Sequence, residues 1–238
     1  YADGGLLSAL IANNNGNGLP SMADDPNINN VTIPSLGISQ ADGNTLKASL
    51  SGGTTLTVTM SANGAPQRDG SIDNDIVAHE WGHYMHNRLV ACGSEQCGGQ
   101  GEGWADFDTM LHKVREGDNV STGTFACGIY VTEIFGDAGY FGVRRFPYSN
   151  DKTKNGLTFK HVENGVNLPN GPQQQAAPDN WETHNVGEVW ATMLFDAYTK
   201  LLVSGGHPFA ESKRRMADYI VAGMKLAPTD PTITEQRD

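Results

Sequence analysis

The chain has 238 residues, which is enough for one large or two small domains with a sizeable core. Its formal net charge is −11, from 27 acidic and 16 basic residues, and this argues against nucleic acid or an anionic membrane as a partner. No run in the sequence is long and apolar enough to span a bilayer. The loops are rich in Asn, Gly, Ser and Thr and only 18% of the residues are charged, a composition that favours an exported protein.

Residues 1–62 differ in composition from the rest of the chain and carry no grouping of catalytic residue types. Apolar or alternating runs predict three short strands, at residues 5–11, 31–33 and 54–60. Residues 13–30 are rich in Asn, Gly, Pro and Asp and predict a loop. Asp42 is a candidate cap for a short helix that runs through Leu46 and Leu50.

A linker at residues 61–70 precedes the first long helix. Apolar residues at three-and-four spacing predict that helix: Ile72, Ile76, Val77, Trp81, Tyr84, Met85 and Leu89. Ser71, Asp73 and Asn74 are candidate caps for its start, and Cys92-Gly93 marks its end.

This helix carries the run His79-Glu80-Trp81-Gly82-His83. Because the two histidines are one helical turn apart, both imidazoles leave the same face and can hold one divalent metal. Glu80 projects close by and is free to act on a metal-bound water. The alternative interpretation is two partly buried histidines on an amphipathic helix.

A second helical pattern begins near Glu102 and stops at Gly117. A carboxylate ligand on a second helix completes a His2Glu zinc site, which leaves a fourth position for water. Asp106 follows Glu102 by one turn and lies on the same face. It is placed to accept the second N–H of a ligand histidine, which fixes the tautomer of that histidine.

The rest of the chain is loop followed by helices. Residues 120–178 are mostly loop, and their clearest apolar piece, 129–135, predicts a strand or a short helix. Loops of this length are usually functional or metal-stabilised. A third long helix is expected at 186–201, a fourth after Pro208, and the start of another in the tail at 228–238.

Three cysteines occur in the chain. Cys92 and Cys97 bracket a short polar loop between the two ligand helices, and in an oxidising compartment they could pair and stiffen it. The alternative is two free thiols. Cys127 would be left unpaired. A structural zinc at these cysteines is not expected, because their spacing lacks a second ligand pair.

Four motifs of the second part of the chain resemble one enzyme family. They are His79-Glu-Trp-Gly-His83 with Asn87-Arg-Leu89, Gly98-Gly-Gln-Gly-Glu102-Gly-Trp-Ala-Asp106-Phe107, Gly142-Val-Arg-Arg-Phe-Pro-Tyr-Ser149, and His184-Asn-Val-Gly-Glu-Val-Trp190. Their order resembles the fungalysin family of secreted zinc metallopeptidases, which are thermolysin-like gluzincins. The resemblance runs from about Arg68 to the C-terminus.

The first part of the chain resembles the second half of a protease-associated domain, a non-catalytic insert of many secreted peptidases. The resemblance rests on Ile33-Pro-Ser-Leu-Gly-Ile-Ser-Gln-Ala-Asp-Gly-Asn-Thr-Leu46. The alternative is an unrelated small α/β segment. Together the two resemblances imply an α+β chain. A partial, small α/β protease-associated segment at 1–62 precedes a mostly helical, thermolysin-like zincin catalytic domain at 63–238, truncated at both ends relative to the family.

For the site, the resemblance implies that His184 donates a hydrogen bond to the oxyanion of the reaction. Asp179 or Glu182 would orient it. Arg144 matches an arginine that holds a substrate backbone carbonyl, and Arg145 is the competing choice. Thermolysin relatives also bind Ca²⁺, and although no calcium-loop pattern is present, four aspartates could supply oxygens: Asp108, Asp118, Asp137 and Asp151.

The other histidines are weaker candidates. His86 lies one turn past His83, and we expect it to face solvent or to cap the helix. His112 and His161 have no partner at ligand spacing, and Glu188 has no assigned role.

The expected function is that of a secreted, extracellular Zn²⁺ metalloendopeptidase acting on proteins or peptides, with Glu80 as general base toward a zinc-activated water. The resemblance also implies a zymogen with an N-terminal propeptide outside this chain. One alternative is a metalloaminopeptidase with the same His2Glu site. Another is a catalytically impaired fragment that binds zinc. A third, a binding module built on the protease-associated half, is disfavoured by the intact ligand set.

Overall fold

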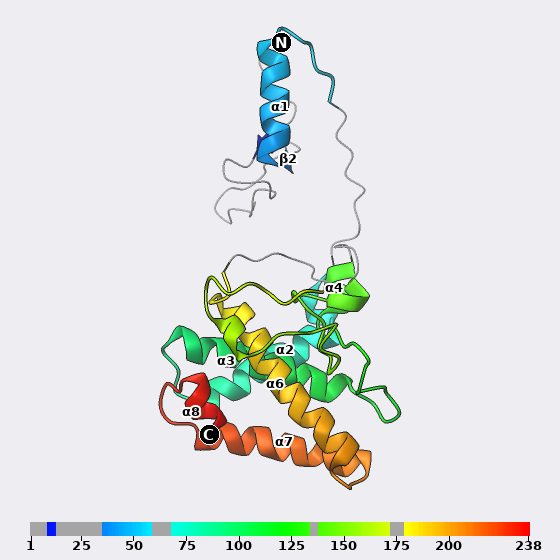
Figure 1. The fold of residues 1–238 in the computed structure, drawn as a ribbon, viewed down its shortest axis with the longest axis vertical. Coiled ribbons are helices and arrows are strands. Elements are labelled where there is room, and N and C mark those ends of the chain that lie inside the picture. Colours follow the sequence, from blue (N-terminus) through cyan, green and yellow to red (C-terminus); the bar gives the residue numbers. More distant parts are fainter. Residues whose placement is uncertain (1–8, 13–34, 59–67, 134–137, 172–178) are drawn as a thin grey trace. The chain divides into compact units, whose positions relative to one another are not determined.

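The structure of the protein is a computed structural model, which describes residues 9–12, 35–58, 68–133, 138–171 and 179–238 (Figure 1). The chain divides into two compact units, Tyr1–Gly64 and Ala65–Asp238. The described residues combine two short strands with many helices, which confirms the predicted α+β class. None of the described helices is long and apolar enough to cross a membrane.

The first unit contains a strand pair and one helix. Strand β1 (Ala9–Ala12) pairs in parallel with β2 (Ser35–Ile38), and helix α1 (Gln40–Ser51) follows. The hydroxyl of Ser39 caps α1 by accepting a hydrogen bond from the backbone N–H of Asp42. The prediction that Asp42 is the cap is therefore wrong. Ser39 has the extended backbone that a cap needs, and Asp42 lies inside the first turn.

The other predicted elements of this unit have mixed outcomes. The strand expected at 5–11 is seen at its end, as β1, and residues 5–8 and 31–33 lie outside the described residues. Residues 54–58 form no strand, although their side chains alternate. Val58 is 50% exposed, so the alternation has no buried face to stabilise it.

The second unit is mostly helical. Its described helices are η1 (Gly70–Ile72), α2 (Asn74–Leu89), α3 (Glu95–Lys113), α4 (Ile129–Thr132), α5 (Ala138–Phe141), η3 (Phe159–Val162), α6 (Thr183–Ser204), α7 (Phe209–Leu226) and α8 (Ile233–Arg237). α3 is central, because it packs against both α2 and α6 and is buried over most of its length (Figure 1). Its aromatic residues meet those of α6, with the rings of Trp104 and Trp190 centred 5.4 Å apart.

The starts of the two ligand helices follow from their caps. α2 begins after Asp73, one of the predicted caps, whose carboxylate accepts the backbone N–H of Asp75. α3 begins at Glu95, earlier than predicted, because the hydroxyl of Ser94 accepts the backbone N–H of Cys97. Glu102 therefore lies in the middle of α3. The first turns of α3 are rich in glycine, so the apolar periodicity of the sequence does not reveal them.

The later helices agree with the sequence. The apolar piece at 129–135 contains a short helix, α4, rather than a strand. α6 spans the predicted third helix, and α7 begins directly after Pro208. The tail forms α8, where Thr232 and Glu235 make a capping box.

Two glycines allow the three central helices to come close at the site. A Cβ atom on Gly82 of α2 would lie 2.5 Å from the Cα atom of Ala105 on α3. A Cβ atom on Gly187 of α6 would lie 2.4 Å from the Cβ atom of Glu102. Neither position has room for a side chain, so both helices approach α3 where it carries Glu102 and Asp106.

We expect Gly82→Ala to reduce stability by about 1–3 kcal/mol, the usual cost of overpacking, and to weaken metal binding because α2 must move away from α3. Gly98→Ala is the matched control on α3. Its new Cβ atom would lie 3.5 Å from Thr183 Cγ2, an ordinary contact. Denaturant unfolding and metal titration of the two variants measure the effect, and equal behaviour of the two would show that the close approach is unimportant.

Candidate metal centre

Three side chains from α2 and α3 converge on one point. The Nε2 atoms of His79 and His83 lie 2.9 Å apart. Oε2 of Glu102 lies 3.4 Å from Nε2 of His79, and Oε1 lies 3.4 Å from Nε2 of His83. The structure thus brings together the three predicted ligands as one cluster of possible metal-binding groups.

The cluster suits zinc in donor type and in size. Two imidazole nitrogens and one carboxylate form a common set of protein ligands for catalytic zinc. A tetrahedral zinc ion with bonds of about 2.0–2.1 Å keeps its donors about 3.3 Å apart. The two nitrogens are 2.9 Å apart and each lies 3.4 Å from one of the two oxygens of Glu102, distances that are close to this value.

Asp106 lies directly behind the ligands. It is fully buried, and its Oδ1 atom accepts a hydrogen bond from Nδ1 of His79 at 2.8 Å. In the neutral ring this bond puts the proton of His79 on Nδ1, so that the lone pair that can bind a metal is on Nε2. The position agrees with the predicted role of Asp106.

Arg144 contacts the acidic residues of α3. Its Nε and Nη2 atoms donate to the two carboxylate oxygens of Asp106 at 2.6 and 2.8 Å, and Nη2 also donates to Glu102 at 3.3 Å. No hydrogen bond of its Nη1 atom is seen among the described residues. The guanidinium therefore supports the ligand set, and one of its nitrogens is left for another partner.

His184 lies in the first turn of α6, at the edge of the cluster. Its Nε2 atom is 3.5 Å from Oε1 of Glu102, and its side chain is 55% exposed. Its Nδ1 atom donates to Glu182 at 2.6 Å. Of the two candidates for orienting His184, the structure therefore places Glu182 beside it, while the carboxylate of Asp179 accepts the backbone N–H of Trp181.

Comparison with known proteins gives the family. The model of a family described as fungalysin metallopeptidase (M36) matches residues 14–238. The chain belongs to this family.

The relatives are fungal proteins. The extracellular metalloproteinase mep of Aspergillus niger is 32% identical over 191 residues, which are 73% of this chain and 27% of the relative. Extracellular metalloproteinase 2 of Trichophyton tonsurans is 29% identical over 192 residues, with the same two shares. The chain thus spans about a quarter of the length of the curated relatives that it matches. The family predicted from the four motifs is confirmed.

The electrostatics of the centre come from buried carboxylates. Burial alone would raise the pKa of Asp106, but Arg144 and His79 hold it far below its usual range. Burial would also raise the pKa of Glu102, yet hydrogen bonds from His79 and His83 lower it. For His79 burial acts downward, and the bonds to Asp106 and Glu102 outweigh it and raise the pKa to about 9. The carboxylates stay ionised, and they favour a positive charge where the metal would lie.

A second buried ion pair, between Arg145 and Glu188, was missed by the sequence reading. Arg145 donates from Nε to Glu188 at 2.6 Å, and its backbone N–H donates to the same carboxylate. Its Nη2 atom donates to the carbonyl of Asn185 in the first turn of α6 at 3.2 Å. These residues line a cavity of about 310 Å³ together with Val143, Arg144, Glu182 and His184. Two features of the sequence could have indicated this ion pair: the two adjacent arginines and the motif that contains Glu188.

Tyr148 is a further residue that the sequence reading missed. Its hydroxyl donates to Oδ2 of Asp106 in the buried interior. The tyrosine belongs to the same motif as Arg144, but the motif alone does not show which of its residues reach the metal centre.

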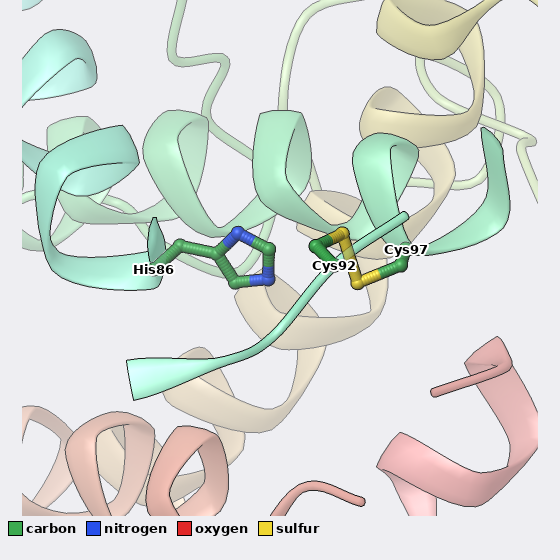
Figure 2. Close-up of side chains that lie close together, drawn as sticks. All are labelled: His86, Cys92 and Cys97. Atoms are coloured by element: carbon green, nitrogen blue, oxygen red, sulfur yellow. A yellow bond between two sulfur atoms is a disulfide. The ribbon is translucent and has the colours of Figure 1, made fainter. Parts of the chain in front are cut away.

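The remaining predicted candidates lie elsewhere. Glu80 is exposed on α2, next to His79. His112 is exposed, and His161 is buried, where its ring accepts the backbone N–H of Thr158. His86 was expected to face solvent or to cap the helix, and the first alternative is wrong, because its side chain points toward α3 and is only 2% exposed (Figure 2).

The structure gives no support for calcium. Among the described residues, the groups that could hold a metal include none of Asp108, Asp118 and Asp151. Asp137 lies outside the described residues. The carboxylates of Asp118 and Asp151 instead accept backbone N–H groups of their own turns.

We expect the zinc affinity of the metal-free protein to rise about tenfold per pH unit up to about pH 9 and then to level off. Below its pKa of about 9, His79 carries a proton that the metal must displace, and above it no proton is lost. Competition with a chromophoric chelator between pH 6 and 10 measures this dependence. An affinity that is constant over the whole range would contradict it.

Proposed function

We propose that this chain carries the catalytic centre of a secreted zinc metalloendopeptidase that hydrolyses peptide bonds of proteins. The convergence of His79, His83 and Glu102, at donor separations suited to zinc, is the observation that supports this function most directly. Family membership and the printed names of the relatives, which are extracellular metalloproteinases, support the reaction class and the extracellular location.

His79, His83 and Glu102 would hold the zinc ion, which when bound would lower the pKa of its water to near neutral and polarise the substrate carbonyl. Glu80 is the general base. It is exposed beside the ligands and accepts the proton of the attacking water, then passes it to the leaving amine. Asp106 keeps His79 in the tautomer that binds metal through Nε2.

Two residues act on the substrate. His184 donates a hydrogen bond from Nε2 to the oxyanion, and Glu182 fixes this orientation by accepting the Nδ1–H group. Arg144 donates from Nη1 to a backbone carbonyl of the substrate, while its other nitrogens stay on Asp106 and Glu102. The assignment of residues 1–62 to a protease-associated domain and the N-terminal propeptide remain predictions.

Glu80→Gln should lower kcat/KM by about 10²–10⁴ while one zinc ion per chain is kept, because the side chain moves protons and does not bind the metal. The assay uses an internally quenched peptide with a blocked N-terminus. Glu116→Gln, which changes another exposed glutamate, is the matched control and should keep full activity.

The same assay separates the alternatives. An enzyme that cuts only peptides with a free N-terminus would be a metalloaminopeptidase. A chain that holds zinc but cuts nothing, while a longer form of the protein is active, would be an impaired fragment. Unchanged activity of Glu80→Gln would remove the proposed general base.

His184→Ala should reduce kcat by about 10²–10³, with KM changed much less, since the lost hydrogen bond is strongest in the transition state. The zinc content should stay the same, because His184 is not among the three ligands. Steady-state kinetics with elemental analysis measures both quantities. A lost zinc ion or an unchanged kcat would contradict the role.

A further inference from the structure

A second group of metal-binding residue types lies at the far end of α2. Cys92 and Cys97 form a disulfide with a Cα–Cα distance of 5.6 Å. Of the two alternatives left open by the sequence, a disulfide or two free thiols, the structure therefore has the disulfide. His86 lies beside it, and the possible ligand atoms of the three residues all lie within 4.8 Å of one another. Figure 2 shows the imidazole pointing toward the two sulfurs.

The imidazole of His86 is a buried polar group without a use in the proposed mechanism. It is 2% exposed, and its Nε2 atom has no hydrogen-bond partner among the described residues. Buried polar atoms are normally paired, and an exception calls for an explanation. Burial, and then the nearby His83, lower the pKa of His86 to about 4, so the ring is neutral and its lone pair is available near neutral pH.

We propose that His86, Cys92 and Cys97 form a second, thiol-dependent zinc site, open when both cysteines are reduced and closed when they form the disulfide. Two thiolates and one neutral imidazole are ligands that zinc prefers. The cysteine spacing alone does not predict the site, because the third ligand comes from the preceding helix. Cys92 is exposed, which gives the ion a path and leaves room for water as a fourth ligand.

The surrounding contacts hold the cysteines in place without the disulfide. The carboxylate of Asp230 accepts the backbone N–H groups of Gly93 and Ser94 at 2.9 and 2.8 Å. The backbone N–H of Asp230 donates to the carbonyl of Ala91 at 2.7 Å. The loop therefore keeps its position against the C-terminal segment when the sulfur–sulfur bond is broken.

Cys97 is buried beside the N-terminus of α3. It lies in the first turn of α3, where Ser94 caps the helix, and helix N-termini stabilise negative charge. In a tetrahedral site with Zn–S bonds of about 2.3 Å, two sulfurs lie about 3.8 Å apart. Rotation of the exposed side chain of Cys92 allows this separation.

The electron balance of the switch is simple. With a phosphine as reductant, the disulfide takes two electrons from phosphorus and two protons from water, the sulfur–sulfur bond breaks to give two thiols, and the oxygen of the water ends on the phosphine oxide. Zinc then displaces the two thiol protons to solvent. In the newly made chain both sulfurs are already thiols, so zinc binds without a reductant until an oxidant forms the disulfide.

The test counts zinc in oxidised and in reduced protein, with tris(carboxyethyl)phosphine as reductant under anaerobic conditions. The wild type should hold one zinc ion per chain when oxidised and two when reduced. In the Glu102→Ala variant, which lacks a ligand of the first site, the numbers should be zero and one. Cobalt in place of zinc should give a thiolate-to-cobalt charge-transfer band in the reduced forms only.

Variants assign the ligands of the second site. Cys92→Ser and His86→Phe should each weaken zinc binding to the reduced Glu102→Ala protein by about 100-fold or more, because even the hydrogen-bond partner of a ligand is typically worth about 10–100-fold in affinity. Cys127→Ser, which changes the third cysteine, should leave the zinc affinity of the reduced Glu102→Ala protein unchanged. If reduction adds no zinc ion to either the wild type or the Glu102→Ala variant, or if His86→Phe binds as tightly as its parent, the proposal is wrong.

Discussion

The carboxylate of Asp106 joins the segments that make the metal centre. It is fully buried on α3, yet it is ionised, because it accepts hydrogen bonds from His79 on α2 and from Arg144 and Tyr148 in the segment after α5. An isolated buried carboxylate would be very costly, so these partners are needed together. Removal of one partner of a buried ion pair typically costs about 3–5 kcal/mol, since the other charge stays behind. The geometry of the ligand His79 therefore depends on a residue that does not bind the metal.

The close contact of three helices makes this arrangement possible. Gly82 brings α2 onto α3 between the two ligand histidines, and Gly187 brings α6 onto α3 at Glu102. The same glycines weaken the helices as isolated segments, because glycine costs about 1 kcal/mol relative to alanine in a helix interior. Packing compensates for this cost, and the result is that ligands from two helices and the histidine of a third reach one point.

Local spacing explains which parts of the site could be predicted. His79 and His83 are one turn apart, and so are Glu102 and Asp106, and a turn of helix fixes which side chains share a face. These relations stay true wherever the helix lies in the fold. The start of α3 was misplaced because its first turns are rich in glycine, whose use becomes clear only when the neighbouring helix is seen. The cap of α2, Asp73, was among three candidates, and the cap of α1, Ser39, was missed, because the sequence does not show which polar residue near a boundary has the extended backbone that a cap needs.

Contacts between distant segments could not be predicted in this way. The sequence offered Asp179 and Glu182 equally as partners of His184, and only the turn that opens α6 puts Glu182 beside the ring. It gave no sign that His86 is buried, because the exposure of that helix face depends on where α3 begins. The role of Glu188 was also open, since its partner Arg145 lies in another motif.

Arg144 and Arg145 connect α6 to α3, the helix that carries Glu102. Arg144 extends to Asp106 and Glu102 on α3, whereas Arg145 extends to Glu188 and to the carbonyl of Asn185 on α6. The segment that contains Arg144 and Arg145 therefore connects the first turn of α6, which carries His184, to α3, which carries Glu102. Both contacts are buried and charged, so they are strong only while each partner is present. The 3.5 Å separation of His184 and Glu102 is set by these pairs together with the Gly187 contact. An intact set of three metal ligands is thus not sufficient for the proposed reaction, because the position of His184, the proposed oxyanion donor, also depends on Arg145 and Glu188, which have no contact with metal or substrate in that proposal.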